Sequence, residues 1–148
     1  MRKLVLFACL MSLSAGAFAA ATVNFAFGRG IIPMRHQTFG AFWFGVRSEG
    51  EHVDGHLVFV QMTMHGRLVA FVYLPEVHRA EFGRNEVHFG GPGVFNGHRV
   101  FVAAGAVDNH GTKHPDLFAL RAVNPRNGEV VYGTGGPVLH GDVVVGHR

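Results

Sequence analysis

The sequence contains very few of the side chains that form covalent intermediates in enzymes. Its single cysteine is Cys9, and Ser48 is the only serine after residue 14. Ser48 lies in VRSEG, which lacks the G-x-S-x-G pattern of a hydrolase nucleophile elbow. Lys113 is the only lysine after Lys3. These absences argue against covalent hydrolase chemistry, and removal of Cys9 with an N-terminal segment would also exclude disulfides and thiol chemistry.

Clusters of basic residues are absent as well. The chain carries 13 Lys and Arg against 10 Asp and Glu, a net charge of +3. Two of the basic residues, Arg2 and Lys3, stand at the very start of the chain. Without them the net charge is about +1, so the isoelectric point of about 9.6 overstates the basic character. We therefore expect no nucleic-acid partner.

The first 21 residues have the pattern of a secretory signal peptide. Arg2 and Lys3 precede an apolar stretch, Leu4–Leu13, and Ala17-Phe18-Ala19 is a small-x-small cleavage pattern. We expect cleavage after Ala19 or Ala21. A membrane-spanning helix needs about 20 apolar residues, and neither this stretch nor any later one reaches that length. The sequence thus predicts an exported protein, periplasmic, extracellular or at the cell surface. Residues 22–148 would form one domain without a membrane span.

The remainder of the chain predicts an all-β fold. Short apolar runs rich in Val and Phe recur between Gly, Asn, Asp and Pro, and no helical periodicity is present. This pattern is typical of an antiparallel barrel or sandwich, here of roughly eight or nine short strands. In TFGAFWFGV, we expect Phe42, Phe44 and Val46 on one face and Ala41, Trp43 and Gly45 on the other. The 14 Phe and 21 Gly indicate an aromatic core with sharply bent strands.

Several short segments predict turns. Asn96-Gly97 separates two apolar runs, as in a type I′ hairpin, and NPRNG at 124–128 predicts a second hairpin. HGD at 140–142 predicts a short turn between two further strands. GGPG at 90–93 and GTGGP at 133–137 are Gly-rich, but no helix follows either segment, as a dinucleotide-binding loop requires. We expect both to be turns.

Histidine is unusually frequent, with 11 residues. His52 and His56, and likewise His110 and His114, lie near acidic residues in the sequence. Zinc or copper needs two to four such ligands converging at about 2 Å. HGTKH lacks the Glu of H-E-x-x-H and falls in a predicted loop, so solvated histidines are the favoured interpretation. A metal site and a pH switch stay open as alternatives.

The stretch AVDNHGTKHPDLFAL, residues 106–120, holds the densest group of polar side chains. Asp108, Asn109 and Asp116 offer the hard oxygen ligands that Ca²⁺ prefers, although their order does not fit an EF-hand loop. The favoured interpretation is that these side chains cap the turn by hydrogen bonds to the backbone. No cofactor is expected. The candidate ions are Ca²⁺ or Zn²⁺, with Asp108, Asn109, Asp116, His110 and His114 as candidate ligands.

A series of short motifs resembles a bacterial secreted β-domain often called the post-choice-of-anchor domain. The motifs are TFGAFWFGV, GHLVF, FNG, AVDNHG, PDLFAL and VYGTGGPVLHGDVVV, which run in order from Thr38 to Val145. Asp108, Asn109 and Asp116 match family positions, whereas His110 and His114 do not, and His140 replaces a glycine. The resemblance implies an exported module, alone or attached to larger surface proteins, and implies no settled activity.

Three functions remain open from the sequence. The first is a non-enzymatic exported domain, structural or binding, with an unknown surface or extracellular partner and Trp43 as the candidate contact residue. The second is a metal-binding protein or small metalloenzyme that uses the His and Asp residues above. The third is a barrel that binds a small ligand in its interior.

Overall fold

The structure is a computed structural model that describes residues 20–148, so the predicted signal segment lies, up to residue 19, outside the described residues. The fold is all-β, as the sequence predicts, with ten strands instead of eight or nine. No helix within the described residues is long and apolar enough to cross a membrane. The strands are β1 (Val23–Pro33), β2 (Thr38–Glu49), β3 (His52–Thr63), β4 (Leu68–Leu74), β5 (Arg79–Phe82), β6 (Glu86–Phe95), β7 (His98–Val107), β8 (Leu117–Val123), β9 (Val130–Pro137) and β10 (His140–His147).

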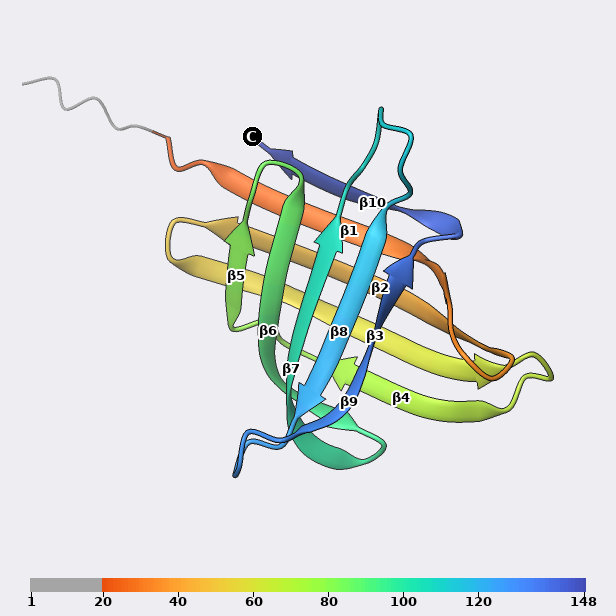
Figure 1. Cartoon of the computed structure of the whole chain (residues 1–148). Coiled ribbons are helices and arrows are strands. Elements are labelled where there is room, and N and C mark those ends of the chain that lie inside the picture. Colours follow the sequence, from red (N-terminus) through yellow and green to blue (C-terminus); the bar gives the residue numbers. More distant parts are fainter. Residues whose placement is uncertain (1–19) are drawn as a thin grey trace, which may run out of the picture.

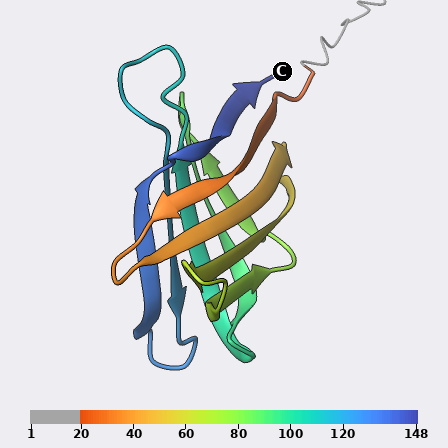
Figure 2. The ribbon, with the colours of Figure 1, turned by 90° about the vertical axis from the view of Figure 1, so that its right-hand side faces the viewer.

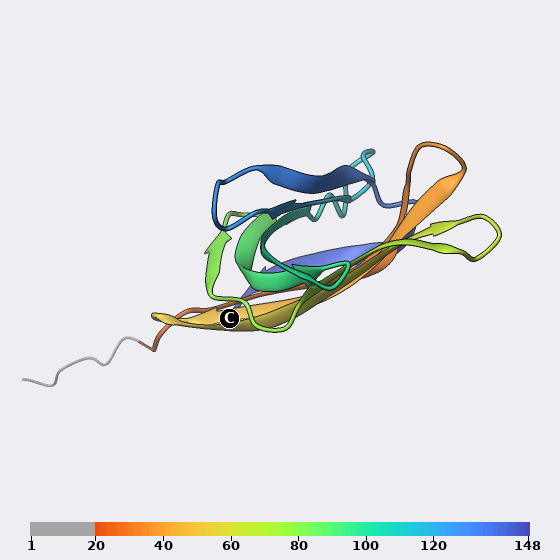
Figure 3. The same ribbon diagram turned by 90° about the horizontal axis from the view of Figure 1, so that it is seen from below.

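All strands belong to one antiparallel sheet that curls back on itself. The strand order is β10-β1-β2-β3-β4-β6-β7-β8-β9, and the short β5 pairs with β6. The curl occurs between β4 and β6, which pair only where Val72 and Tyr73 meet Phe95 and Val94. The sheet thus folds into two layers whose strands cross, β10 and β1–β4 behind and β5–β9 in front (Figure 1). The two layers are seen from the side in Figure 2 and from below in Figure 3.

The core lies between the two layers and is built largely from phenylalanine. Phe42 and Phe44 of β2 are buried while Trp43 is exposed, so the predicted faces of this strand are confirmed. The Phe118 ring of the front layer stacks on Phe42 at 4.1 Å between ring centroids. It also faces Phe44 and Phe59 at 6.1 and 6.2 Å. These rings fill the space between the layers.

A polar chain crosses the core at one place. The Tyr132 hydroxyl donates to the side-chain oxygen of Gln61 at 2.7 Å, and the Gln61 amide donates to the Thr38 hydroxyl at 3.0 Å. Burial raises the pKa of Tyr132 to about 12. This chain connects β9 of the front layer with β3 and β2 of the back layer.

Two of the five turns expected from the sequence are present in the structure. Asn96 and Gly97 both have positive φ, 46° and 84°, which confirms the type I′ hairpin. The second hairpin, between β8 and β9, is also confirmed. The other three predicted turns are wrong: GGPG lies inside β6, GTGGP inside β9, and HGD inside β10. The chain instead changes layer at Val138 and Leu139, between β9 and β10.

Candidate functional site

The loop between β7 and β8 is organised around two carboxylates. Asp108 accepts hydrogen bonds from the backbone N–H of His110 at 2.9 Å and of Val145 at 3.1 Å, one on each oxygen. Asp116 in the same way accepts from the N–H of Asn109 and of Val143, both at 2.8 Å. Each of the four carboxylate oxygens therefore has a backbone donor. The capping expected of this turn is present, and it also reaches β10.

The bonds to Val143 and Val145 join the β7–β8 loop to β10, the strand at one end of the curled sheet. β10 is an edge strand that pairs with β1 on one side only. In an antiparallel pair, alternate residues direct their N–H away from the partner, and on β10 these include Val143 and Val145. Unpaired edge donors invite pairing with other chains. Asp116 and Asp108 accept hydrogen bonds from these two N–H groups. We call this pair of carboxylates the aspartate latch.

The latch predicts a large effect for a small substitution. Asp116→Ala leaves the N–H groups of Asn109 and Val143 without their acceptor. We expect the free energy of unfolding to fall by about 2–3 kcal/mol, because a hydrogen bond to a charged group contributes about 1.5–3 kcal/mol. The control Asp54→Ala removes an exposed carboxylate beside His52. It should change the free energy of unfolding by less than about 0.5 kcal/mol. Urea unfolding of both variants measures the difference, and equal losses would contradict the latch.

Asp142 is a third carboxyl at this place, which the sequence analysis did not single out. Loss of hydration beside the neighbouring chain raises the pKa of the Asp142 carboxyl, and a hydrogen bond with Asp116 and the charges of Asp116 and Asp108 raise it further. The folded protein therefore holds the Asp142 proton more tightly than the unfolded chain does. This interaction favours folding below pH about 4, the ordinary range of Asp. The contribution is lost as the pH rises through the raised pKa of the folded state.

Asp142→Asn should consequently stabilise the protein at neutral pH. We expect a gain of at most about 1 kcal/mol, because the group is exposed and its interactions are screened by solvent. The gain should largely disappear near pH 2.5, well below the ordinary Asp pKa of about 3.9, where the native aspartic acid is neutral in both states. Thermal unfolding at the two pH values measures this. A variant that is less stable than the native protein at pH 7 would contradict the like-charge interpretation.

The four candidate histidine ligands lie in two separate parts of the fold. His52 and His56 lie four residues apart on β3, or about 13 Å along an extended strand. His110 and His114 are exposed in the β7–β8 loop. Within residues 20–148 no group of three or more His, Cys, Asp or Glu side chains is arranged to hold a metal ion. Metal binding by Asp108, Asn109, Asp116, His110 and His114 stays a prediction, and the carboxylate oxygens it would use already accept backbone hydrogen bonds.

Trp43 lies on the outer face of the back layer, among many apolar side chains. It pairs across strands with Val58, and Val58 pairs with Tyr73 on β4. Directly opposite residues of an antiparallel pair share one face of the sheet. The outer face of the back layer therefore carries four adjacent rows of largely apolar side chains, interrupted by Arg29 opposite Trp43 and by Asp142 opposite Arg29. We call this surface the Trp43 face. Its apolar members are Phe27, Ile31, Phe39, Ala41, Trp43, Val58, Val60, Met62, Leu68, Phe71, Tyr73 and Val144.

Three large side chains of the Trp43 face are more than half open to solvent. Trp43 is 59% exposed, Phe27 53% and Leu68 57%. The Trp43 ring stands edge-on to the His56 imidazole at 5.1 Å between centroids, so its orientation is held within the face. Large contiguous apolar patches are rare on monomeric proteins and mark interaction surfaces.

Comparison with family models, with curated proteins and with solved structures finds no match to this chain. The resemblance to the post-choice-of-anchor domain therefore stays a prediction.

Proposed function

We propose that this protein is an exported, non-enzymatic structural module that self-associates through its Trp43 face. The observation that carries the proposal is the largely apolar outer side of β10 and β1–β4, which is most continuous on β2–β4 and has the most exposed aromatic ring, Trp43, at its centre. The scarcity of covalent nucleophiles supports a non-enzymatic role: Ser48 is buried, and Cys9 lies outside the described residues.

The dimensions of the face suit a second copy of the same chain. Five strands about 4.8 Å apart, each with four outward positions about 6.8 Å apart, cover roughly 24 by 27 Å, or about 650 Å². Two copies would together bury about 1,300 Å² or more, within the range of about 1,200–2,000 Å² for stable interfaces. Two sheets can pack face to face at about 10 Å. The face is thus large enough for a stable dimer.

The charges within and beside the face are compatible with self-pairing. Within it, Arg29 of β1 pairs with Asp142 of β10, so this row contains both signs of charge. The row next to the apolar rows contains Arg47 and, opposite it on β3, Asp54. Arg47 also forms an ion pair with Glu49 at 2.8 Å. A rim with both signs of charge can meet its own copy about a two-fold axis without net repulsion. A rim of one sign would instead favour a partner of opposite charge.

Sedimentation equilibrium of the purified protein tests the proposal. We expect a monomer–dimer equilibrium that Trp43→Arg weakens by about 100-fold or more, as the loss of a central aromatic contact of about 3 kcal/mol does. Val130→Arg is the matched control, because Val130 is 53% exposed but belongs to β9 in the other layer. This variant should dimerise like the native protein.

Two outcomes would contradict self-association through the Trp43 face. One is a native protein that stays monomeric at every concentration up to the millimolar range. The other is a dimer that Val130→Arg weakens as strongly as Trp43→Arg does. Binding of the monomer to a polysaccharide or a lipid vesicle through Trp43 would assign the face to a different occupant.

A further inference from the structure

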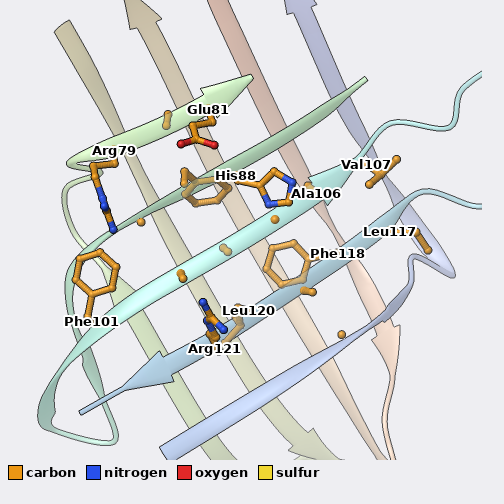
Figure 4. Close-up of a pocket in the computed structure, with 18 of the residues that line it drawn as sticks. Arg79, Glu81, His88, Phe101, Ala106, Val107, Leu117, Phe118, Leu120 and Arg121 are labelled. Atoms are coloured by element: carbon orange, nitrogen blue, oxygen red, sulfur yellow. The ribbon is translucent and has the colours of Figure 1, made fainter. Parts of the chain in front are cut away.

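The outer side of the front layer has a second surface feature, on the opposite side of the molecule from the Trp43 face. A trough with a volume of about 730 Å³ runs along β7 and β8, which is within the size range of small-molecule sites. Figure 4 shows the side chains around it. The sequence analysis assigned none of the residues that line it to a ligand-binding site.

The floor of the trough is formed by the smallest residues. Gly90 pairs with Ala103 across β6 and β7, and in the next row Gly105 pairs with Ala119 across β7 and β8. Larger side chains stand on both sides, so the absence of side chains in the middle leaves a channel. The His88 imidazole leans over Gly105, where an added Cβ would lie only 3.1 Å from its Nδ1. His88 thereby forms part of one wall.

Two arginines face each other across this floor. Arg79 of β5 pairs with Gly90, Gly90 with Ala103, and Ala103 with Arg121 of β8. The two arginines thus belong to one cross-strand row and are three strand spacings apart, about 14 Å between Cα atoms. The Arg79 guanidinium lies 5.4 Å from the centroid of the Phe101 ring, which holds it at this end of the trough. Within residues 20–148 neither arginine forms an ion pair.

The opposite end of the trough is apolar. Val107 and Leu117 pair with each other two rows further along, about 14 Å from the arginine row. Figure 4 shows Arg79 and Phe101 at one end and Val107 and Leu117 at the other. The acidic side chains nearby are Glu81, which lines the wall opposite Arg121, and Glu86, which lies 3.7 Å from the His88 ring nitrogen. The trough is therefore polarised, cationic at one end and apolar at the other.

We infer that the trough binds an elongated apolar carboxylate, with the carboxylate between Arg79 and Arg121 and the apolar chain along the Ala103–Ala119 floor toward Leu117. Guanidinium groups bind carboxylates by paired, charge-assisted hydrogen bonds. A floor of Gly and Ala allows a chain to lie close to the sheet. The inference is independent of the self-association proposed above, because the trough belongs to the other layer.

Titration of the purified protein with decanoate, followed by backbone amide chemical shifts, tests the inference. We expect saturable shifts on β6, β7 and β8. Arg79→Gln and Arg121→Gln should each weaken binding by about tenfold or more, because each removes a charge-assisted contact. Ala119→Leu fills the floor at an exposed position and should abolish binding. Arg126→Gln, in the β8–β9 turn, is the matched control and should bind like the native protein.

Two further ligands test the contributions of the carboxylate and of the apolar chain separately. Decanol retains the chain without the charge and acetate retains the charge without the chain, so both should bind more weakly than decanoate by about tenfold or more. Equal affinity for decanol, or unchanged decanoate affinity in the Arg79→Gln/Arg121→Gln double variant, would overturn the assignment. Binding only to anionic phospholipid vesicles, without shifts from free decanoate, would overturn it as well. Trp43→Arg should leave decanoate binding intact, which distinguishes failure of the trough from failure of the dimer.

Discussion

Phe118→Ala is expected to lower the free energy of unfolding by about 3–5 kcal/mol, the usual cost of removing a fully buried phenylalanine ring. Phe118 is 1% exposed and stacks on Phe42 at 4.1 Å. It is the ring of the front layer that contacts the most rings of the back layer. Its loss would leave a cavity between the layers. The neighbouring rings cannot close this cavity, because they are fixed to two separate strands, β2 and β3.

Urea unfolding followed by circular dichroism measures this loss. Leu117→Ala is the matched control, because Leu117 is the preceding residue on β8 but is 43% exposed on the outer side. We expect this control to lose less than about 1 kcal/mol. Phe118→Leu should fall between the two variants, since it retains part of the buried volume. A loss in Phe118→Ala no greater than in Leu117→Ala would show that the two layers do not pack as described.

The second large effect is expected at Gly141, on β10 opposite Gly30 of β1. Gly141 has a φ of +123°, a conformation that residues with a side chain rarely adopt. A Cβ at this position would overlap the carbonyl oxygen of Arg29 and the Cα of Gly30, both backbone atoms that cannot rotate away. Gly141→Ala should therefore cost about 3 kcal/mol or more, from backbone strain together with the clash.

The clash and strain at Gly141 also predict which strands separate first in the Gly141→Ala variant. β10 would separate from β1 near Gly30, and the aspartate latch at Val143 and Val145 would weaken with it. Hydrogen exchange should thus accelerate on β10 and β1 more than on β6–β8. Gly128→Ala is the control, because Gly128 has a φ of +73° but no atom near an added Cβ. It should lose only about 1–2 kcal/mol. Equal losses in both variants would contradict the tight pairing of β1 with β10.

The sequence predicts the strands well where one face is buried and the other is open. In β2 the alternation of Phe42, Trp43 and Phe44 identifies both faces, because a two-residue period follows directly from strand geometry. The three wrong turns have a common cause. Gly91, in GGPG, lies within the β6 strand, where an added Cβ would meet the Glu76 carbonyl oxygen at 2.7 Å. Glycine there permits close approach of another chain segment, which local composition cannot distinguish from a turn.

The candidate sites were predictable to different degrees. The capping role of Asp108 and Asp116 follows from local turn chemistry, but their bonds to Val143 and Val145 join residues 27 and 37 positions apart. The contribution of Asp142 depends on the same long-range contact. Arg79 and Arg121 face each other only because four strands pair in one register, and neither forms a sequence motif. The alternation in LFALRAV, with Ala119 and Arg121 on one face, is the signal that could have indicated the trough.

Trp43 is the only tryptophan of the chain, so its fluorescence reports directly on the face proposed to self-associate. The most direct measurement is the emission spectrum of the purified protein across a dilution series, with its mass determined by sedimentation at the same concentrations. The proposal predicts emission typical of a buried indole in the dimer and a shift to longer wavelength as the dimer dissociates. Emission of a solvent-exposed indole at every concentration, including those at which a dimer is present, would contradict it.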